Sequence, residues 1–325
     1  MTGFRNVLTA WLTRLWRTDA PLTATGLGMT VVLILAIAGL WLDPRTVAGA
    51  PAWLKPAKFA ASIAIYTLTL AWIFTWLADW RRTRRWVSRV SAVVFVLEVA
   101  IIALQAARGT TSHFNTATLF DGVLFSIMGA GILLQTLASI AVLVALWRQH
   151  IEDRAMGWAL RLGLTITIAA AFSGGLMTQP TSEQLEAART SGQMTTSGAH
   201  TVGAPDGGPG LPATGWSTTH GDLRVAHFAG LHAMQVLPLV ALTVARVRGW
   251  NDHTRARIIL SASGSYAALF LLLMWQAWRG QSVIAPDALT AMAVTLWVLL
   301  SAVAALWSTR TSRARHSTPE RLVAP

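Results

Sequence analysis

The sequence contains repeated apolar runs of about 20 residues, the length that an α-helix needs to cross the hydrocarbon core of a bilayer. A helix suits that environment because it pairs its backbone polar groups internally. Of the 325 residues, 54% are hydrophobic and only 12% are charged, whereas about 25% are charged in soluble domains. The sequence therefore predicts an all-α fold, a polytopic integral membrane helix bundle.

Eight transmembrane helices are predicted from these runs and from the charges, glycines and prolines that separate them. Together they form one transmembrane domain, residues 21–309. The predicted spans are 22–42, 58–77, 87–105, 119–147, 157–177, 224–245, 258–278 and 288–307.

Basic segments flank this domain on both sides. In residues 1–20, apolar side chains recur at helical spacing with three arginines opposite them. This pattern predicts an N-terminal amphipathic helix that lies on the cytoplasmic face of the membrane. Residues 310–325 are predicted to form a basic cytoplasmic tail.

The distribution of arginine decides the predicted orientation, because cytoplasmic loops carry an excess of Lys and Arg. Most of the 26 basic residues fall on one side if both termini are cytoplasmic, and the predicted location is the cell (inner) membrane. This topology accounts for the formal net charge of +12, so no nucleic-acid partner is expected. The expected partners are the lipid bilayer and a small-molecule ligand.

One long segment, residues 178–223, is predicted to be an extracytoplasmic loop rich in Gly, Pro and Thr. It has turn chemistry and little apolar content, and long loops of this kind are commonly lids or disordered. It leads directly into the helix that carries His227 and His232.

The outer helix ends hold more polar residues than the orientation explains. Ionisable side chains at membrane depth cost about 2.5–3.5 kcal/mol each on insertion scales, so they usually face a partner or a cavity. We therefore expect one polar ligand pocket in the extracytoplasmic half, beneath the loop. The candidate ligand-binding residues are Lys58, Glu98, Gln105, Arg108, His113, Asn115, Asp121, Arg224, His227, His232, Gln235, Gln276 and Arg279.

Several of these residues also have a structural interpretation. Arg108 and Arg279 suit contacts with lipid headgroups, Lys58 suits the membrane interface, and Asn115 and Asp121 suit helix caps. Glu98 lies in mid-span and needs a partner on another helix.

The histidines give the most specific hypothesis, a haem b held between helices for electron transfer as in cytochrome b. Neutral imidazole is an axial ligand for haem iron, and His113 and His227 enter from the same side of the membrane. Gly230, one turn from His227, is predicted to leave room for a flat macrocycle. Nearby arginines are predicted to pair with the haem propionates.

Two alternatives remain. The first is a transporter or receptor for an anionic or amphiphilic small molecule or lipid, with proton coupling through Glu98 and His232. The second is an intramembrane metal-dependent enzyme with His113, His227 and His232 as metal ligands. The five-residue spacing of His227 and His232 disfavours one metal site on that helix. No nucleophile or HExxH motif is present, so catalytic residues are not assigned.

A sharp bend is also expected in the sixth predicted span. Pro238 lacks a backbone N–H, so the carbonyl of Met234 loses its helical partner there. The sequence contains no cysteine, so disulfides and thiolate ligands are excluded.

Overall fold

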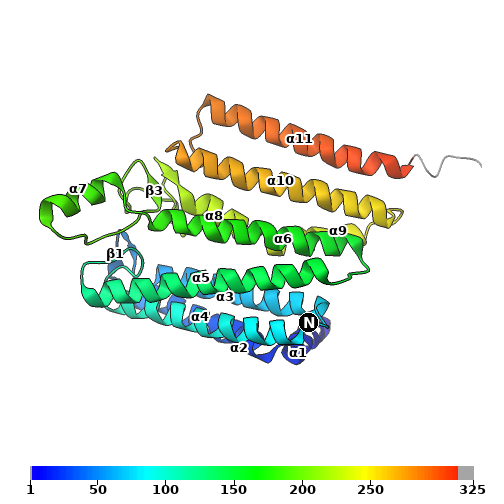
Figure 1. Cartoon of the computed structure of the whole chain (residues 1–325), viewed down its shortest axis with the longest axis horizontal. Coiled ribbons are helices and arrows are strands. Elements are labelled where there is room, and N and C mark those ends of the chain that lie inside the picture. The colour runs from blue at the N-terminus through cyan, green and yellow to red at the C-terminus, as the bar shows by residue number, and fades with distance from the viewer. Residues whose placement is uncertain (1, 314–325) are drawn as a thin grey trace, which may run out of the picture.

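The computed structural model describes residues 2–313, which form a bundle of long helices that run roughly along one axis (Figure 1). Two-residue strands occur in the connections at one end. The long helices are α2 (Ala20–Leu42), α3 (Leu54–Ile73, extended by the 3-10 turn Phe74–Trp76), α4 (Arg81–Ala107), α5 (Leu119–Arg148), α6 (Arg154–Ser173), α8 (Leu223–Leu231), α9 (Ala233–Ala245), α10 (Asp252–Trp278) and α11 (Ala288–Arg313).

Within the described residues, seven helices are long and apolar enough to cross a membrane, or eight if the bent pair α8 and α9 is one span. The all-helical prediction is therefore confirmed, and these helices have the length and composition for several membrane crossings. The helix boundaries extend beyond the predicted spans where charged residues occur. The helix expected at residue 87 begins at Arg81, because arginine side chains can reach polar surroundings while their backbone stays helical.

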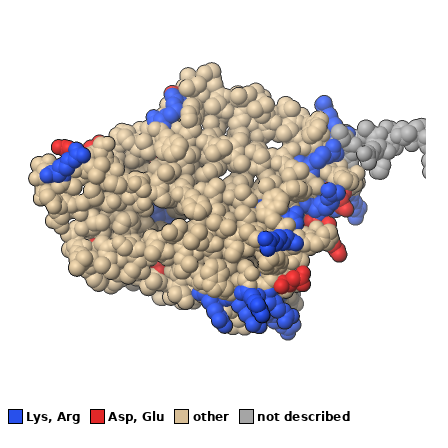
Figure 2. Space-filling model, viewed as in Figure 1, with Lys and Arg blue, Asp and Glu red and all other residues tan. Residues whose placement is uncertain are grey.

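The two ends of the bundle differ in chemistry. Lys and Arg side chains gather at the end where α1 lies, which we call the arginine end (Figure 2). The strands and α7 (Ser182–Ser191) lie at the opposite end, which we call the loop end (Figure 1). Its two small sheets pair β1 (Thr46–Val47) with β2 (Ala50–Pro51) and β3 (Thr201–Val202) with β4 (Gly221–Asp222).

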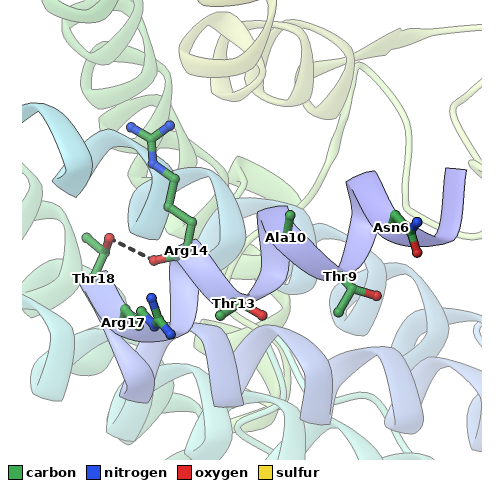
Figure 3. Close-up of a pocket in the computed structure, with 7 residues that line it drawn as sticks. All are labelled: Asn6, Thr9, Ala10, Thr13, Arg14, Arg17 and Thr18. Atoms are coloured by element: carbon green, nitrogen blue, oxygen red, sulfur yellow. Dashed lines mark hydrogen bonds between the residues drawn. The ribbon is translucent and has the colours of Figure 1, made fainter. Parts of the chain in front are cut away.

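Helix α1 (Thr2–Thr18) precedes the first long helix. Leu15 anchors it in the core, whereas Val7 and Trp16 are exposed. Its polar side chains, with Arg14 and Arg17 among them, line an open groove that α1 forms alone (Figure 3). Placement of this helix on a membrane surface stays a prediction.

The main hydrophobic core fills the arginine half of the bundle. Helix α2 packs along α3, α4 along α5, and α6 packs against α9 and α10. We call this group the arginine-end core, and its fully buried side chains include Leu70, Ile73, Phe74, Val142, Leu146, Leu160, Leu164, Met234 and Leu237.

The bend predicted at Pro238 occurs instead at His232, where α8 and α9 meet at 45°. The Thr167 hydroxyl of α6 inserts there, since it donates to the Leu231 carbonyl (3.2 Å) and accepts from the Met234 N–H (3.1 Å). A side chain that enters the helical hydrogen-bond ladder in this way breaks the helix. Pro238 lies inside α9, so the location of the bend was predicted wrongly.

The segment 178–223 is folded onto the helix ends. The Thr116 N–H donates to the Thr195 carbonyl (3.0 Å), and the Ala199 N–H donates to the Met177 carbonyl (2.9 Å). Backbone hydrogen bonds of this kind compensate for the segment's low apolar content. It covers the loop end of the bundle as an ordered cap.

Candidate functional site

Four polar residues at the joint between α4 and α5 form a closed clasp. The Arg108 guanidinium donates to Asp121 Oδ1 (2.6 Å) and to the Gln105 amide oxygen. Gln105 Nε2 donates to the same Asp121 oxygen (2.8 Å), and the Thr118 hydroxyl donates to Asp121 Oδ2 (2.7 Å). Three predicted ligand residues therefore bind one another, and the clasp joins two helices.

Three more of the predicted residues are also engaged locally. The Asn115 side chain bonds to the backbone of its own turn, and Gln276 Nε2 donates to the Ser282 carbonyl (2.9 Å). Arg279 forms a two-pronged ion pair with Asp287 (2.6 and 3.1 Å). These contacts tie the connections between helices.

A second group of charged residues meets inside the loop end. Lys55 and Lys58 are half-buried on the first turns of α3. Lys55 lies within electrostatic range of Lys58, Glu98, Asp206 and Arg224, which come from four different segments of the chain. We call this group the loop-end cluster, and it comprises Lys55, Lys58, Glu98, His113, His200, Asp206, Asp222 and Arg224.

Glu98 and His113 form one side of the cluster. The His113 Nε2 atom lies 3.7 Å from Glu98 Oε1, and Glu98 is 2% exposed. The His113 ring packs against Phe59 of α3 and Phe125 of α5, at centroid distances of 5.4 and 6.5 Å. The neighbour of Glu98 therefore lies on the connection after α4 and not on another helix as expected, and Glu98 Oε1 accepts no hydrogen bond within residues 2–313.

Two acid–base pairs close the opposite side. Asp206 Oδ2 lies 2.6 Å from His200 Nδ1, and Asp206 also accepts from the backbone N–H of His200. Asp222 is 2% exposed and accepts from the Arg224 guanidinium at 2.6 and 2.9 Å. The Asp222 carboxylate neutralises Arg224 and fixes the loop to the start of α8, and the Asp206 carboxylate holds the turn that carries His200.

The two lysines are left without such a partner. Lys58 Nζ donates to the Thr214 carbonyl of the loop (3.0 Å). None of the ion pairs formed within residues 2–313 involves a lysine. Lys55 and Lys58 are therefore the cations of the cluster that form no direct ion pair within residues 2–313.

A hollow opens in the loop half of the molecule, with Lys or Arg atoms at its bottom (Figure 2). It lies where α5 and α6 diverge toward the loop end (Figure 1). The two helices are joined nearer the arginine end, where Arg161 Nε donates to the Leu146 carbonyl (2.9 Å). The charged interior of the loop end is therefore reached through a recess in the bundle.

His227 lies against the end of α6. Its Nδ1 is 2.7 Å from the Ala170 carbonyl oxygen and 3.3 Å from the Ser173 hydroxyl. A carbonyl can only accept, so Nδ1 carries the proton and Nε2 keeps its lone pair. Gln235, further along the same helix pair, donates from Nε2 to Thr69 Oγ1 of α3 (3.4 Å).

The space expected beside Gly230 is filled. A Cβ on Gly230 would lie 2.5 Å from Ala170 Cβ and 2.8 Å from Phe270 Cδ2. This glycine therefore allows close helix packing. The prediction that it leaves room for a macrocycle is wrong. His232 is exposed at the helix break.

The three candidate metal ligands face different surroundings. His113 faces Glu98, His227 faces α6, and His232 is exposed. Within residues 2–313, no group of three or more His, Asp or Glu residues is arranged to hold a metal ion.

The two loop histidines of the cluster, His113 and His200, should make the stability of the fold depend on pH. Burial, together with the positive charges of Lys55 and His200, holds the pKa of His113 well below its ordinary value, and burial likewise lowers the pKa of His200. Below about pH 6.5 the unfolded chain therefore binds more protons than the folded chain. The free energy of unfolding consequently decreases as the pH is lowered.

We expect each histidine to remove up to about 1.4 kcal/mol per pH unit between pH 6.5 and its lower folded pKa. Thermal unfolding in detergent at pH 7.5 and 5.5 measures this loss. His113→Gln and His200→Gln should each flatten the dependence. Equal or greater stability of the wild type at pH 5.5 would contradict the neutral state of these imidazoles.

Four residues of the cluster were outside the predicted set, namely Lys55, His200, Asp206 and Asp222. Lys55 lies one helical turn from Lys58, so the spacing of the two lysines in the sequence could have indicated that they share a helix face. His200 and Asp206 are separated by a turn in a segment without periodicity, so no sequence pattern indicated their pairing.

The fold and the cluster define an all-helical protein with helices long and apolar enough to cross a membrane and with a charged recess at one end of its bundle. Comparison with protein-family models, curated proteins and solved structures finds no match for this chain. Its function is therefore inferred from the chemistry of its own residues.

Proposed function

We propose that the protein binds a small anionic molecule, one that bears a carboxylate or phosphate, in the loop-end cluster. The observation that carries this proposal is the pair of lysines, Lys55 and Lys58, which lack a carboxylate partner in a half-buried recess. Desolvated charges are costly unless they are paired, so an incoming anion supplies the missing partner.

The pairing within the cluster favours an anion at the two lysines. Arg224 is paired with Asp222, and Asp206 is hydrogen-bonded to His200. Neither ammonium group forms an ion pair within residues 2–313. The beginning of α3 adds the positive end of its helix dipole, because Lys55 stands on its first turn.

The orientation of the protein follows from the same charges. Arginines gather at the arginine end (Figure 2), and the positive-inside rule places that end in the cytoplasm. The recess and its ordered cap then face the extracytoplasmic side of the cell membrane. The protein acts there as a receptor or transporter for an anionic or amphiphilic molecule.

Thermal-shift measurements on the detergent-solubilised protein test the proposal with three probes: inorganic phosphate, malonate and a short-chain phosphatidic acid. A probe at ten times its Kd stabilises the folded state by about 1.4 kcal/mol. Removal of one charge-assisted hydrogen bond costs about 1.5–3 kcal/mol, so Lys55→Gln or Lys58→Gln should weaken binding about 10- to 100-fold.

Arg279→Gln is the matched control, because Arg279 also lies at the loop end but is engaged by Asp287. It should keep the response of the wild type. A response that survives the double variant Lys55→Gln/Lys58→Gln, or that is lost equally in Arg279→Gln, places the anion elsewhere and refutes the proposal.

Haem is the second candidate, and His227 is the observation that favours it. Its Nδ1 is anchored on a backbone carbonyl and its Nε2 makes no hydrogen bond within residues 2–313, which is the arrangement of many metal-bound histidines. A reduced-minus-oxidised absorbance spectrum of protein expressed with ample haem tests this candidate. A spectrum without a Soret band removes it.

A further inference from the structure

A stripe of polar residues runs down α3 from the loop-end cluster to the middle of the bundle. Lys55, Ser62, Tyr66 and Thr69 recur at spacings of seven, four and three residues, so they share one face of the helix. From Lys55 to Thr69 the helix rises about 20 Å. All four side chains are partly accessible although they lie in an apolar helix.

Two glutamines from other helices meet this stripe at its deep end. Gln135 of α5 donates from Nε2 to the Tyr66 hydroxyl (3.1 Å), which also pairs with the Ser139 hydroxyl (2.9 Å). Gln235 of α9 donates to Thr69. Helices α3, α5 and α9 therefore bring polar side chains to the same depth.

Three buried oxygens beside this stripe accept no hydrogen bond from residues 2–313. They are Oε1 of Glu98, Oε1 of Gln135 and Oε1 of Gln235, and Glu98 and Gln135 are only 2% and 5% exposed. A buried acceptor without a donor costs about 1–3 kcal/mol, and native proteins satisfy such atoms with water or ligand.

The polar stripe ends at the arginine-end core. One turn beyond Thr69, the side chains of Ile73 and Phe74 are fully buried and belong to the same core as Leu237 of α9. An apolar layer of this kind excludes water and ions.

We propose that the loop-end recess continues as a hydrated half-channel, lined by Ser62, Tyr66, Thr69, Gln135 and Gln235, which opens at the loop end and stops at the arginine-end core. It admits water and small hydrogen-bonding solutes to the middle of the bundle from one side. The half-channel deepens the proposed anion site by extending the same recess, but it requires no bound anion.

The absence of cysteine from the sequence allows a direct test by substituted-cysteine accessibility. Ser62→Cys and Thr69→Cys are reconstituted in oriented vesicles and exposed to a membrane-impermeant, negatively charged thiosulfonate. We expect both thiols to react from the loop side and to be protected from the arginine side.

Two controls on the same helix give the reference rates. Thr67→Cys is fully buried against α2, and Ile65→Cys faces outward from the bundle with 47% exposure. Burial in apolar surroundings raises the pKa of a thiol, and each unit lowers the thiolate fraction tenfold. Ser62→Cys and Thr69→Cys should therefore react at least about tenfold faster than either control.

Equal rates at all four positions, or equal labelling from both sides, would overturn the half-channel. If a cysteine variant fails to fold, hydroxyl-radical footprinting of the wild type decides, with Tyr66 expected to be oxidised and the fully buried Met234 spared. An unmodified Tyr66 refutes the proposal. The same cysteines are also labelled in the Lys55→Gln/Lys58→Gln background. If labelling persists there while anion binding is lost, the half-channel is distinct from the anion site.

Discussion

Asp222→Ala should lower the free energy of unfolding by about 3–5 kcal/mol, because it leaves the Arg224 guanidinium, whose side chain is only 19% exposed, without its counter-charge. The Asp222 carboxylate accepts from the Arg224 guanidinium, from the Arg224 N–H at the start of α8, and from the Ser217 N–H of the loop (2.9 Å). The substitution therefore removes an ion pair, a helix cap and a loop anchor together.

Asp287→Ala is the matched control, because Asp287 forms a similar two-pronged pair with Arg279 and also caps a helix. Its side chain is 41% exposed, whereas that of Asp222 is 1% exposed. Exposed pairs contribute about 0–1 kcal/mol and a lost cap about 1 kcal/mol. Thermal unfolding of both variants in one detergent should show the larger loss for Asp222→Ala. Similar losses would mean that burial does not govern the strength of these pairs.

Gly221→Ala should detach the cap from α10 although it adds one methyl group. A Cβ on Gly221 would lie 2.0 Å from the Ala277 carbonyl oxygen and 3.0 Å from the Gly280 Cα atom. Both obstacles are backbone atoms, so β4 or the end of α10 must move. We expect a loss of at least about 1–3 kcal/mol and faster proteolysis of the segment 178–223.

Gly208→Ala provides the control for this substitution. Gly208 lies in the same segment, and a Cβ on it would meet no atom within 4 Å. Its effect should stay within about 0.5 kcal/mol. If Gly221→Ala behaves like Gly208→Ala in thermal unfolding and limited proteolysis, the cap does not rest on α10 as described.

The sequence predicted the helical class because hydrophobicity is a local property. Runs of about 20 apolar residues have one stable form in a bilayer, and α5 begins at Leu119 as expected. The bend of the sixth span was misplaced because its cause lies on another helix. Pro238 was visible in the sequence, whereas the insertion of the Thr167 hydroxyl depends on how α6 packs.

The polar residues of the outer helix ends were found in the sequence, but their grouping was not. Shared depth suggested one pocket for Arg108, Asp121 and His113 alike. In the structure, Arg108 is held by Asp121, and His113 contacts Glu98. Depth is set by position along a helix, whereas contact depends on rotation about its axis and on the neighbouring helix.

The sequence alone determined that this chain is a bundle of helices apolar enough to cross a membrane, with unexplained polar groups at one end, since both follow from composition and spacing. Only the tertiary structure decided which of those groups neutralise one another and that Lys55 and Lys58 are left unpaired. The physical reason is that a charge is satisfied by whatever lies within a few ångströms of it, and those neighbours come from distant segments of the chain.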